Sequence, residues 1–228
     1  TLGGNGEVVF GGISYNNFLV SSLNAGQTLT VGAGITVHSG TGGQGGTIQA
    51  NSAILNQGAI AADASGQLVV LTGNGLTNAG TLSAQGGGNL LLNGGYTTTR
   101  LGTLVNDGTG AIYLAGTLNN GGTTLTLTAD TGRLNLSGGT IQGGTVTAVG
   151  GGGLSVVSGV LDGVTLDVDL LVNSGSVEAR NGLTLANGHR ALLNQVDGRA
   201  SSLTFTGDSQ TLGGNGEVVF GGISYNNF

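Results

Sequence analysis

Residues 56–71 read NQGAIAADASGQLVVL, and residues 78–93 read NAGTLSAQGGGNLLLN. The two stretches align without a gap at an offset of 22 residues. The matched pairs are Asn56/Asn78, Gly58/Gly80, Ile60/Leu82, Ala62/Ala84, Gly66/Gly88, Leu68/Leu90 and Val70/Leu92. Farther along, residues 139–146 (GTIQGGTV) match residues 159–166 (GVLDGVTL) at an offset of 20. A period of 20–22 residues is typical of a solenoid, in which each repeat forms one coil stacked on the next.

The short stretches inside each period indicate the kind of solenoid. LTV at 29–31 and LTL at 125–127 alternate apolar and polar residues, as strands with one buried face do. Gly, Asn and Asp separate such stretches and supply the positive φ angles that tight corners need. The Leu-x-x-Leu-x-Leu skeleton of leucine-rich repeats is not found. The sequence therefore predicts an all-β parallel β-helix (β-solenoid) of about 10–11 coils of 20–22 residues. We expect the coil to be right-handed, because parallel crossovers almost always are.

Inward positions should recur in successive coils at a common place after an N-x-G or G-x phrase. The residues at these positions are Ile60, Leu82, Ile141, Leu161 and Val177. We predict that they are buried and stack in aliphatic columns, because side chains of a parallel β-helix lie in register from coil to coil.

The composition excludes several classes of protein. Of 228 residues, 50 are Gly and only 7% are charged, and Pro, Cys, Met, Trp and Lys are absent. The many aliphatic side chains exclude a disordered chain, and the absence of Cys excludes disulfides and thiolate metal sites. A net charge of −6 with scattered Arg argues against a nucleic-acid partner, and no apolar run is long enough to insert into a membrane.

A much longer repeat joins the two ends of the chain. Residues 1–18 and 211–228 both read TLGGNGEVVFGGISYNNF, at an offset of 210. Such identity indicates tandem duplication, so we expect 1–228 to form a single continuous β-helix. Residues 1–210 are then one repeat unit and 211–228 begin the next identical unit, with neighbouring repeats of the same chain as partners. Because the chain begins at Thr1 without a signal peptide, we expect it to be a segment of a longer protein.

Three acidic residues are the strongest candidates for chemistry. Asp162, Asp167 and Asp169 lie in LDGVTLDVDL, where Asp167 and Asp169 would share the outward face of a strand. Two such carboxylates could hold Ca²⁺ or cleave a glycosidic bond. The interpretation we favour is that they are solvated surface acids, because most charges are exposed and the nearest Arg is Arg180, in the next coil.

The remaining motifs are incomplete. GGNGE at 3–7 lacks the final Asp of a calcium nonapeptide, and the glycine-rich spans 42–46 and 150–153 lack the ending of a phosphate loop. His38 and His189 are far apart in sequence, and no close acid pair accompanies either. We therefore predict no catalytic, cofactor-binding or metal-binding residue, no cofactor, and no enzymatic activity.

Two surface patterns also have a structural interpretation and a functional one. T-x-T phrases could form an ice-binding face, but their spacing is irregular, so we interpret them as solvated strand residues. Aromatic residues gather where the long repeat recurs: Phe10, Tyr15, Phe18, Phe205, Phe220, Tyr225 and Phe228. They either pack at one coil, which we favour, or form a patch on which a carbohydrate stacks.

N-x-G-x-aliphatic phrases at 56–60, 78–82 and 173–177, together with the stretch 138–185, resemble a known family. They are similar to the passenger β-helices of autotransporters and filamentous-haemagglutinin-type adhesins, and to the tandem repeats of giant bacterial surface adhesins. The resemblance implies a secreted protein on the bacterial cell surface, acting as a structural rod or stalk that projects a distal binding region. The alternative is a carbohydrate-active or glycan-binding β-helix, with glycans or host or bacterial surfaces as partners.

Overall fold

The computed structural model describes residues 1–11, 17–40 and 45–222. It confirms the predicted class, because 64% of the chain is strand and 2% is helix, in parallel sheets that form a β-solenoid of about 8 turns. The chain falls into two compact units. The N-terminal unit comprises Thr1–Gly116 with Asp130–Gly132, and the C-terminal unit comprises Thr117–Ala129 with Arg133–Phe228.

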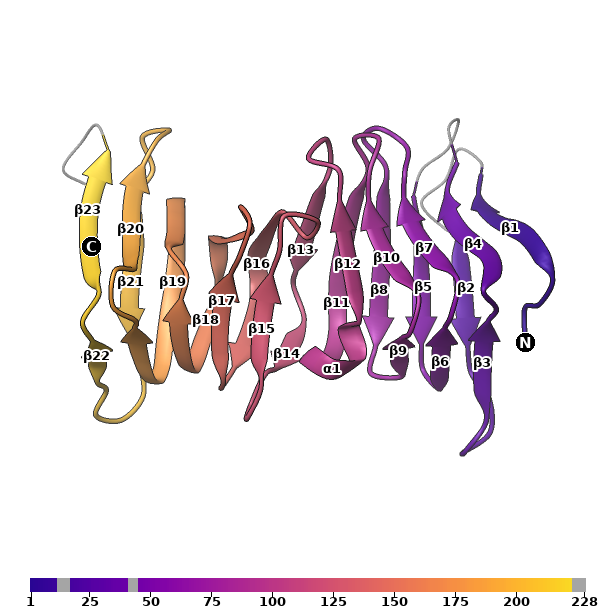
Figure 1. Ribbon diagram of the computed structural model, residues 1–228, viewed down its shortest axis with the longest axis horizontal. Helices are drawn as coiled ribbons and strands as arrows, with labels where there is room; N and C mark the ends of the chain where they lie inside the picture. The colour runs from indigo at the N-terminus through magenta and orange to yellow at the C-terminus, as the bar shows by residue number, and fades with distance from the viewer. Residues whose placement is uncertain (12–16, 41–44, 223–228) are drawn as a thin grey trace. The chain divides into compact units, whose positions relative to one another are not determined.

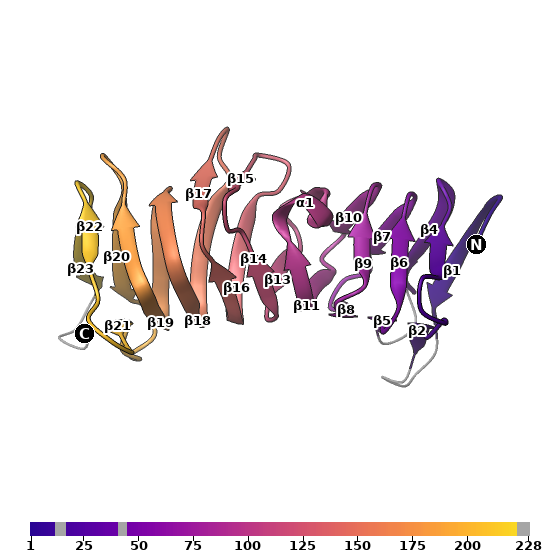
Figure 2. The same cartoon turned by 90° about the horizontal axis from the view of Figure 1, so that it is seen from below.

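The N-terminal unit consists of three parallel ladders, and successive strands along the chain visit each ladder in turn (Figure 1). The first ladder contains β1 (Asn5–Phe10), β4 (Gly34–Ser39), β7 (Ala59–Ala62), β10 (Thr81–Ala84) and β12 (Thr103–Asn106). The second contains β2 (Phe18–Ser21), β5 (Gly46–Ala50), β8 (Leu68–Gly73), β11 (Asn89–Thr97) and β13 (Ala111–Leu114). The third contains β3 (Thr28–Val31), β6 (Ala53–Asn56) and β9 (Leu76–Asn78), and Figure 2 shows β6 and β9 side by side. In the fourth coil a short helix, α1 (Thr98–Leu101), takes the place of the third strand.

Longer strands mark the C-terminal unit. Its elements are β14 (Thr117–Asn119), β15 (Thr124–Leu127), β16 (Arg133–Gln142), β17 (Thr145–Ala148), β18 (Gly153–Asp167), β19 (Leu170–Leu185), β20 (Arg190–Gln195), β21 (Ser202–Phe205), β22 (Leu212–Gly214) and β23 (Glu217–Gly222). β18 and β19 run through the corners of their coils, with register shifts at Val156/Ser158 and Asp162/Val164 where the chain turns. The pairing strands are all parallel, so this unit has the same coiled architecture.

Aliphatic columns fill the interior, as predicted. Ile60, Leu82, Ile141, Leu161 and Val177 are all fully buried. Leu82 lies in register between Ile60 and Leu104. In the C-terminal unit Leu161 lies in register between Ile141 and Ala179. Val177 belongs to another column, where it faces Gly159 and Leu203.

The N-x-G phrases form a buried polar ladder at one corner. The Asn56 amide donates to Asn78 Oδ1 at 2.7 Å, and the Asn78 amide donates to the Leu101 carbonyl at 2.8 Å. Each of these two amide nitrogens therefore donates to the next coil, as a buried donor requires, whereas the buried Asn56 Oδ1 has no hydrogen-bond partner among the described residues. The glycine of the phrase is needed for close approach, since a Cβ on Gly80 would lie 2.0 Å from the Gly58 carbonyl oxygen.

The structure has about 8 turns, against the predicted 10–11 coils, and the length of a coil varies more than the internal repeats suggested. Leu154 pairs with Leu170, a spacing of only 16 residues, whereas Asn5 pairs with Gly34, a spacing of 29. Corners absorb this difference, since they can lengthen without disturbing the columns. The spacing between paired residues on neighbouring coils therefore ranges from 16 to 29 residues, wider than the predicted 20–22.

The gapless alignment is correct in its first half and wrong in its second. Ile60 pairs with Leu82 as expected, but the structure pairs Val69 with Leu90 and Leu71 with Leu92. The corner at 85–88 is one residue shorter than the corner at 63–67, so the register moves by one. Leu68, which the alignment matched to the buried Leu90, is consequently exposed.

Candidate functional site

The acidic pair Asp167 and Asp169 lies at the corner between β18 and β19. Leu166, Val168 and Leu170 are buried, and the two carboxylates point outward, as the alternation predicted. The chain bends at Val168, so the two acids do not belong to one strand.

The next coil brings a histidine and an arginine to this pair. Residues 187–188 form a turn before β20, which begins at Arg190. His189 Nδ1 lies 3.2 Å from Asp169 Oδ1, and its Nε2 lies 3.4 Å from Asp167 Oδ1. The Arg190 backbone N–H donates to Asp169 Oδ1 at 3.1 Å, and its guanidinium Nε lies 3.6 Å from Asp169 Oδ2. We call Asp167, Asp169, His189 and Arg190 the acid–histidine cluster.

The electrostatics of the cluster favour a charged Asp169. Desolvation is the largest single influence and raises the pKa of this carboxyl. Hydrogen bonds from the Arg190 N–H and from His189, with the nearby charge of Arg190, outweigh it and hold the pKa below its usual value. Asp169 is therefore an anion at neutral pH, suited to binding a cation or a polar group rather than to donating a proton.

This cluster corrects one inference from the sequence. His189 does have a close acid pair, which the sequence hid because Asp169 lies 20 residues away. Arg180 lies in the next coil, as expected from the sequence, but it does not contact Asp167 or Asp169. Its guanidinium bonds Glu178 at 2.8 and 2.9 Å, and its backbone pairs with Asp162.

A shallow depression of about 410 Å³ adjoins the acid–histidine cluster. Its lining consists of Arg133, Ala148, Gly152, Gly153, Val168, Asp169, Gly188 and His189. Asp167 and Asp169 are both about half exposed, so water screens their charges. Within 1–11, 17–40 and 45–222, no group of three or more acidic or His residues is placed to hold a metal ion.

His38 in the N-terminal unit has a similar setting, and here too the sequence expectation of no acid pair is wrong. Its Nδ1 lies 2.9 Å from Asp63 Oδ2, and its Nε2 lies 3.8 Å from Glu7 Oε2. Asp63 also accepts a hydrogen bond from the Ser39 hydroxyl at 2.9 Å. These contacts link β1, β4 and the residue that follows β7, which is a structural role.

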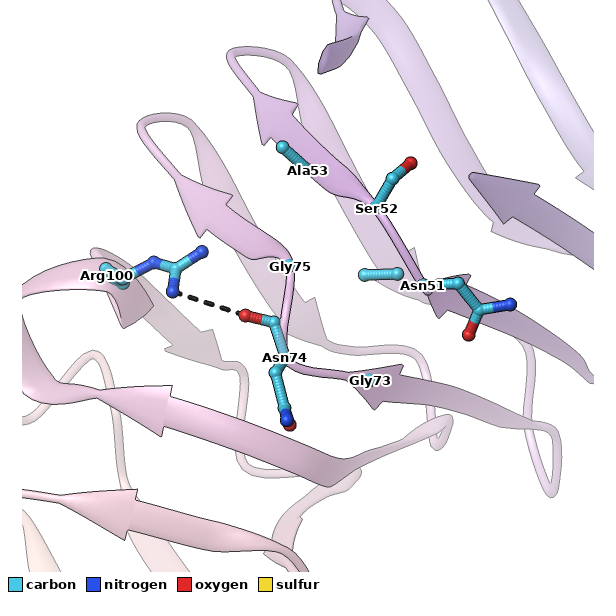
Figure 3. A pocket seen from close by; sticks show the side chains of 8 residues that line it. Asn51, Ser52, Ala53, Gly73, Asn74, Gly75 and Arg100 are labelled. Carbon is cyan, nitrogen blue, oxygen red and sulfur yellow. Dashed lines mark hydrogen bonds between the residues drawn. The ribbon is translucent and has the colours of Figure 1, made fainter. Parts of the chain in front are cut away.

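A second depression, of about 490 Å³, lies at the corner between the second and third ladders of the N-terminal unit. Its lining comprises Ala50–Ala53, Gly73–Gly75 and Arg100. Figure 3 shows Arg100 reaching over the corner, where its Nη1 donates to the Asn74 carbonyl at 3.2 Å. Its Nε donates to the Thr77 hydroxyl at 2.9 Å. The lining contains no carboxylate, so this pocket offers amides, hydroxyls and one cation.

The other sequence motifs lie at corners. Gly4, Gly150 and Gly151 have φ angles of 86°, 63° and 103°, the conformation that a glycine turn provides. Residues 42–44 of the first glycine-rich span lie outside the described residues, as do Tyr15, Tyr225 and Phe228. Among the described aromatics Phe10 is buried, whereas Phe18, Phe205 and Phe220 are exposed.

Threonines of neighbouring coils form only short rows in the register that the structure gives. Thr126 pairs with Thr147, but Thr147 then pairs with Asp167, and its hydroxyl donates to that carboxylate at 2.9 Å. Thr28 and Thr30 pair with Ala53 and Leu55. These neighbours agree with a solvated strand face rather than a regular threonine array.

Comparison with known proteins finds no matching family model, no matching curated protein and no matching solved structure. Among the described residues, none of the helical segments has the length and apolar character that crossing a membrane requires.

Proposed function

We propose that the chain is a structural repeat of a secreted bacterial surface adhesin, and that it acts as a rod or stalk that projects a distal binding region. The observation that carries this proposal is the identity of residues 1–18 and 211–228 in a chain of parallel coils. β1 is the first strand of its ladder and β23 the last strand of its own. A coil sequence that recurs at such ladder ends suits a unit that is added repeatedly to a growing stack.

The surface chemistry also supports a mechanical role. The acid–histidine cluster and the Arg180–Glu178 pair are exposed polar contacts between or along coils, and contacts of this kind add little to stability. The buried columns and the asparagine ladder, in contrast, hold each coil to the next. Strong contacts between coils in the interior, with weak ones at the surface, would make the stack stiff along its axis.

Displaying the repeat on bacteria tests the stalk function. A binding tip of known ligand would be fused to one, two or four units and presented to ligand beneath a polymer layer of defined thickness. We expect binding to rise with the number of units and to be unchanged by the surface variants Asp167→Asn and Asp169→Asn. Binding that ignores the number of units would refute the proposal.

Glycan cleavage or binding is the second candidate, favoured by the depression beside the acid–histidine cluster. The lowered pKa of Asp169 keeps this carboxyl ionised, which does not suit a general acid. We therefore predict that no reducing ends or unsaturated products form from acidic or neutral polysaccharides. Product formation that Asp167→Asn or Asp169→Asn abolishes would establish an enzyme instead.

A further inference from the structure

The repeated segment occurs in two complementary settings. In its first copy β1 pairs with the following strand β4. In its second copy β23 pairs with the preceding strand β20. The structure thus shows the same sequence paired once with the strand of the following coil and once with the strand of the preceding coil.

Both copies turn the same residues inward. Val8 pairs with Val37 and Phe10 with Ser39, all of them residues of the inward face. In the second copy, Val218 and Phe220 pair with the fully buried Ala191 and Leu193. The repeated segment can therefore pair with a strand such as β20 on one side and a strand such as β4 on the other while the same side chains stay inward. A shift of one residue between the two pairings would instead turn these side chains outward.

The two copies also use different backbone groups. The Phe10 carbonyl accepts from Gly40 N at 3.0 Å, whereas Glu217 N, the counterpart of Glu7, donates to the His189 carbonyl at 3.0 Å. A residue in a parallel ladder bonds to one neighbour, and the next residue bonds to the other. The bonds that face the following coil in the first copy are therefore compatible with those that face the preceding coil in the second.

Residues 1–2 and their counterparts 211–212 show the same pattern of backbone hydrogen bonds. Leu2 N donates to the Thr30 carbonyl and the Leu2 carbonyl accepts from Gly32 N, both at 2.8 Å. In the second copy it is the Thr211 carbonyl, the counterpart of Thr1, that accepts from Leu183 N at 2.9 Å. At two separate places in the segment, the backbone groups that bond to the preceding coil thus differ from those that bond to the following coil.

The second copy leaves an apolar surface uncovered. Phe220 is 60% exposed and Leu212 48%, whereas Phe10 is only 4% exposed. Phe10 is covered by β5, because a Cβ built on Gly46 would lie 2.2 Å from its ring carbon Cγ. Gly46 therefore provides the slot into which the aromatic ring of the preceding coil fits.

We propose that the open edge of β22 and β23 is the docking surface for the first coil of a second copy of this unit. A strand with the sequence of Gly34–Ser39 pairs with β23 so that Val218 meets the second copy's Val37 and Phe220 its Ser39. A strand with the sequence of Thr28–Val31 pairs beside Leu212, and the second copy's Gly46 covers the Phe220 ring. The inference rests on the tandem arrangement of the proposed function, but not on an adhesive role.

Thiol labelling tests the burial of Phe220, since the chain has no Cys of its own. Phe220→Cys would be made in the present chain and in a longer chain in which a second copy of residues 19–228 follows residue 228. We expect alkylation at least about tenfold slower in the longer chain, because the thiol must then wait for local opening. Phe10→Cys is the protected control and Val9→Cys the reactive control in both chains. Equal labelling of Phe220→Cys in the two chains would overturn the proposal.

Disulfide formation tests the register. Glu7 and Thr36 pair within the first coil, so Glu7→Cys with Thr36→Cys is the reference pair in the present chain. In the two-unit chain, Glu217→Cys with Thr36→Cys of the second copy should oxidise as readily. Glu217→Cys with His38→Cys of the second copy is shifted by two residues and should oxidise more slowly. A preference for the shifted pair would show that the docking register is wrong, whereas adhesion assays would be unaffected by that failure.

Discussion

At the scale of the residue, the stacked column through Leu82 shows what a single side chain contributes. Leu82 is fully buried between Ile60 and Leu104 on the neighbouring coils. Each column residue is in contact with two coils, so one substitution affects three strands. The sequence could predict this position, because an aliphatic residue stands at the same place in the phrases at 56–60, 78–82 and 173–177.

Leu82→Asp should lower the free energy of unfolding by several kcal/mol, because it buries a carboxylate with no partner. Urea denaturation would measure the loss. Leu68→Asp is the matched control, since Leu68 is 38% exposed and should change stability by no more than about 0.5 kcal/mol. Similar effects of the two substitutions would contradict the described register.

Asp107 makes stability depend on acid pH. Its carboxylate accepts hydrogen bonds from the Thr109 hydroxyl at 2.6 Å, from Thr109 N at 2.8 Å and from Gly86 N at 2.8 Å. The Thr109 hydroxyl has the largest effect, and together these bonds lower the pKa of Asp107 to about 2. Because the folded pKa lies below the unfolded value of 3.8, the stabilisation is complete above pH 3.8 and is lost as pH falls towards 2.

Asp107→Asn should therefore reduce stability at pH 5, and the difference from the wild type should shrink as the pH approaches 2. Urea midpoints measured between pH 2 and 5 would follow this change. Asp130→Asn, at an exposed turn of the same unit, serves as the control. A difference that stays constant over this range would mean that the Asp107 hydrogen bonds do not stabilise the fold.

At the scale of the element, strands were easier to predict than corners. Alternation in LTL at 125–127 requires a strand with one buried face, and the structure has β15 there. Corners rich in Gly and Asn tolerate one residue more or less, as the comparison of 63–67 with 85–88 shows. Which residues of two coils meet depends on the lengths of these corners. For this reason the outward direction of Asp169 was predictable from the sequence, whereas its contact with His189 was not.

The asparagine corner has the strictest steric requirement. Gly80→Ala should destabilise the protein by about 1–3 kcal/mol, because its Cβ would lie 2.0 Å from the Gly58 carbonyl oxygen and the coils would have to separate. Gly11→Ala is the control, since its Cβ would meet no atom within 4 Å. Thermal denaturation of both variants would measure the difference. Equal stability would show that the coils at this corner can move apart freely.

At the scale of the whole molecule, coils depend on their neighbours, so a solenoid is weakest where a coil has only one. Phe220→Ser should change the stability of the present chain by no more than about 0.5 kcal/mol, because the side chain is exposed. In a two-unit chain the same substitution should cost about 3 kcal/mol, the usual cost of truncating a buried Phe. Phe10→Ser in the present chain is the control for a buried ring. Equal small losses from Phe220→Ser in both chains would mean that successive units are independent beads.

The pairing of strands in parallel coils also determines how the chain responds to tension. Neighbouring strands lie about 4.8 Å apart, whereas a coil of 22 residues, such as the one from Ile60 to Leu82, reaches about 75 Å when drawn straight. Pulling on the two ends would strip coils from the stack one after another. Each released coil would lengthen the tether roughly fifteenfold over its folded rise. Such a chain would lengthen stepwise under a steady load. It would also absorb the work of a sudden pull before it breaks.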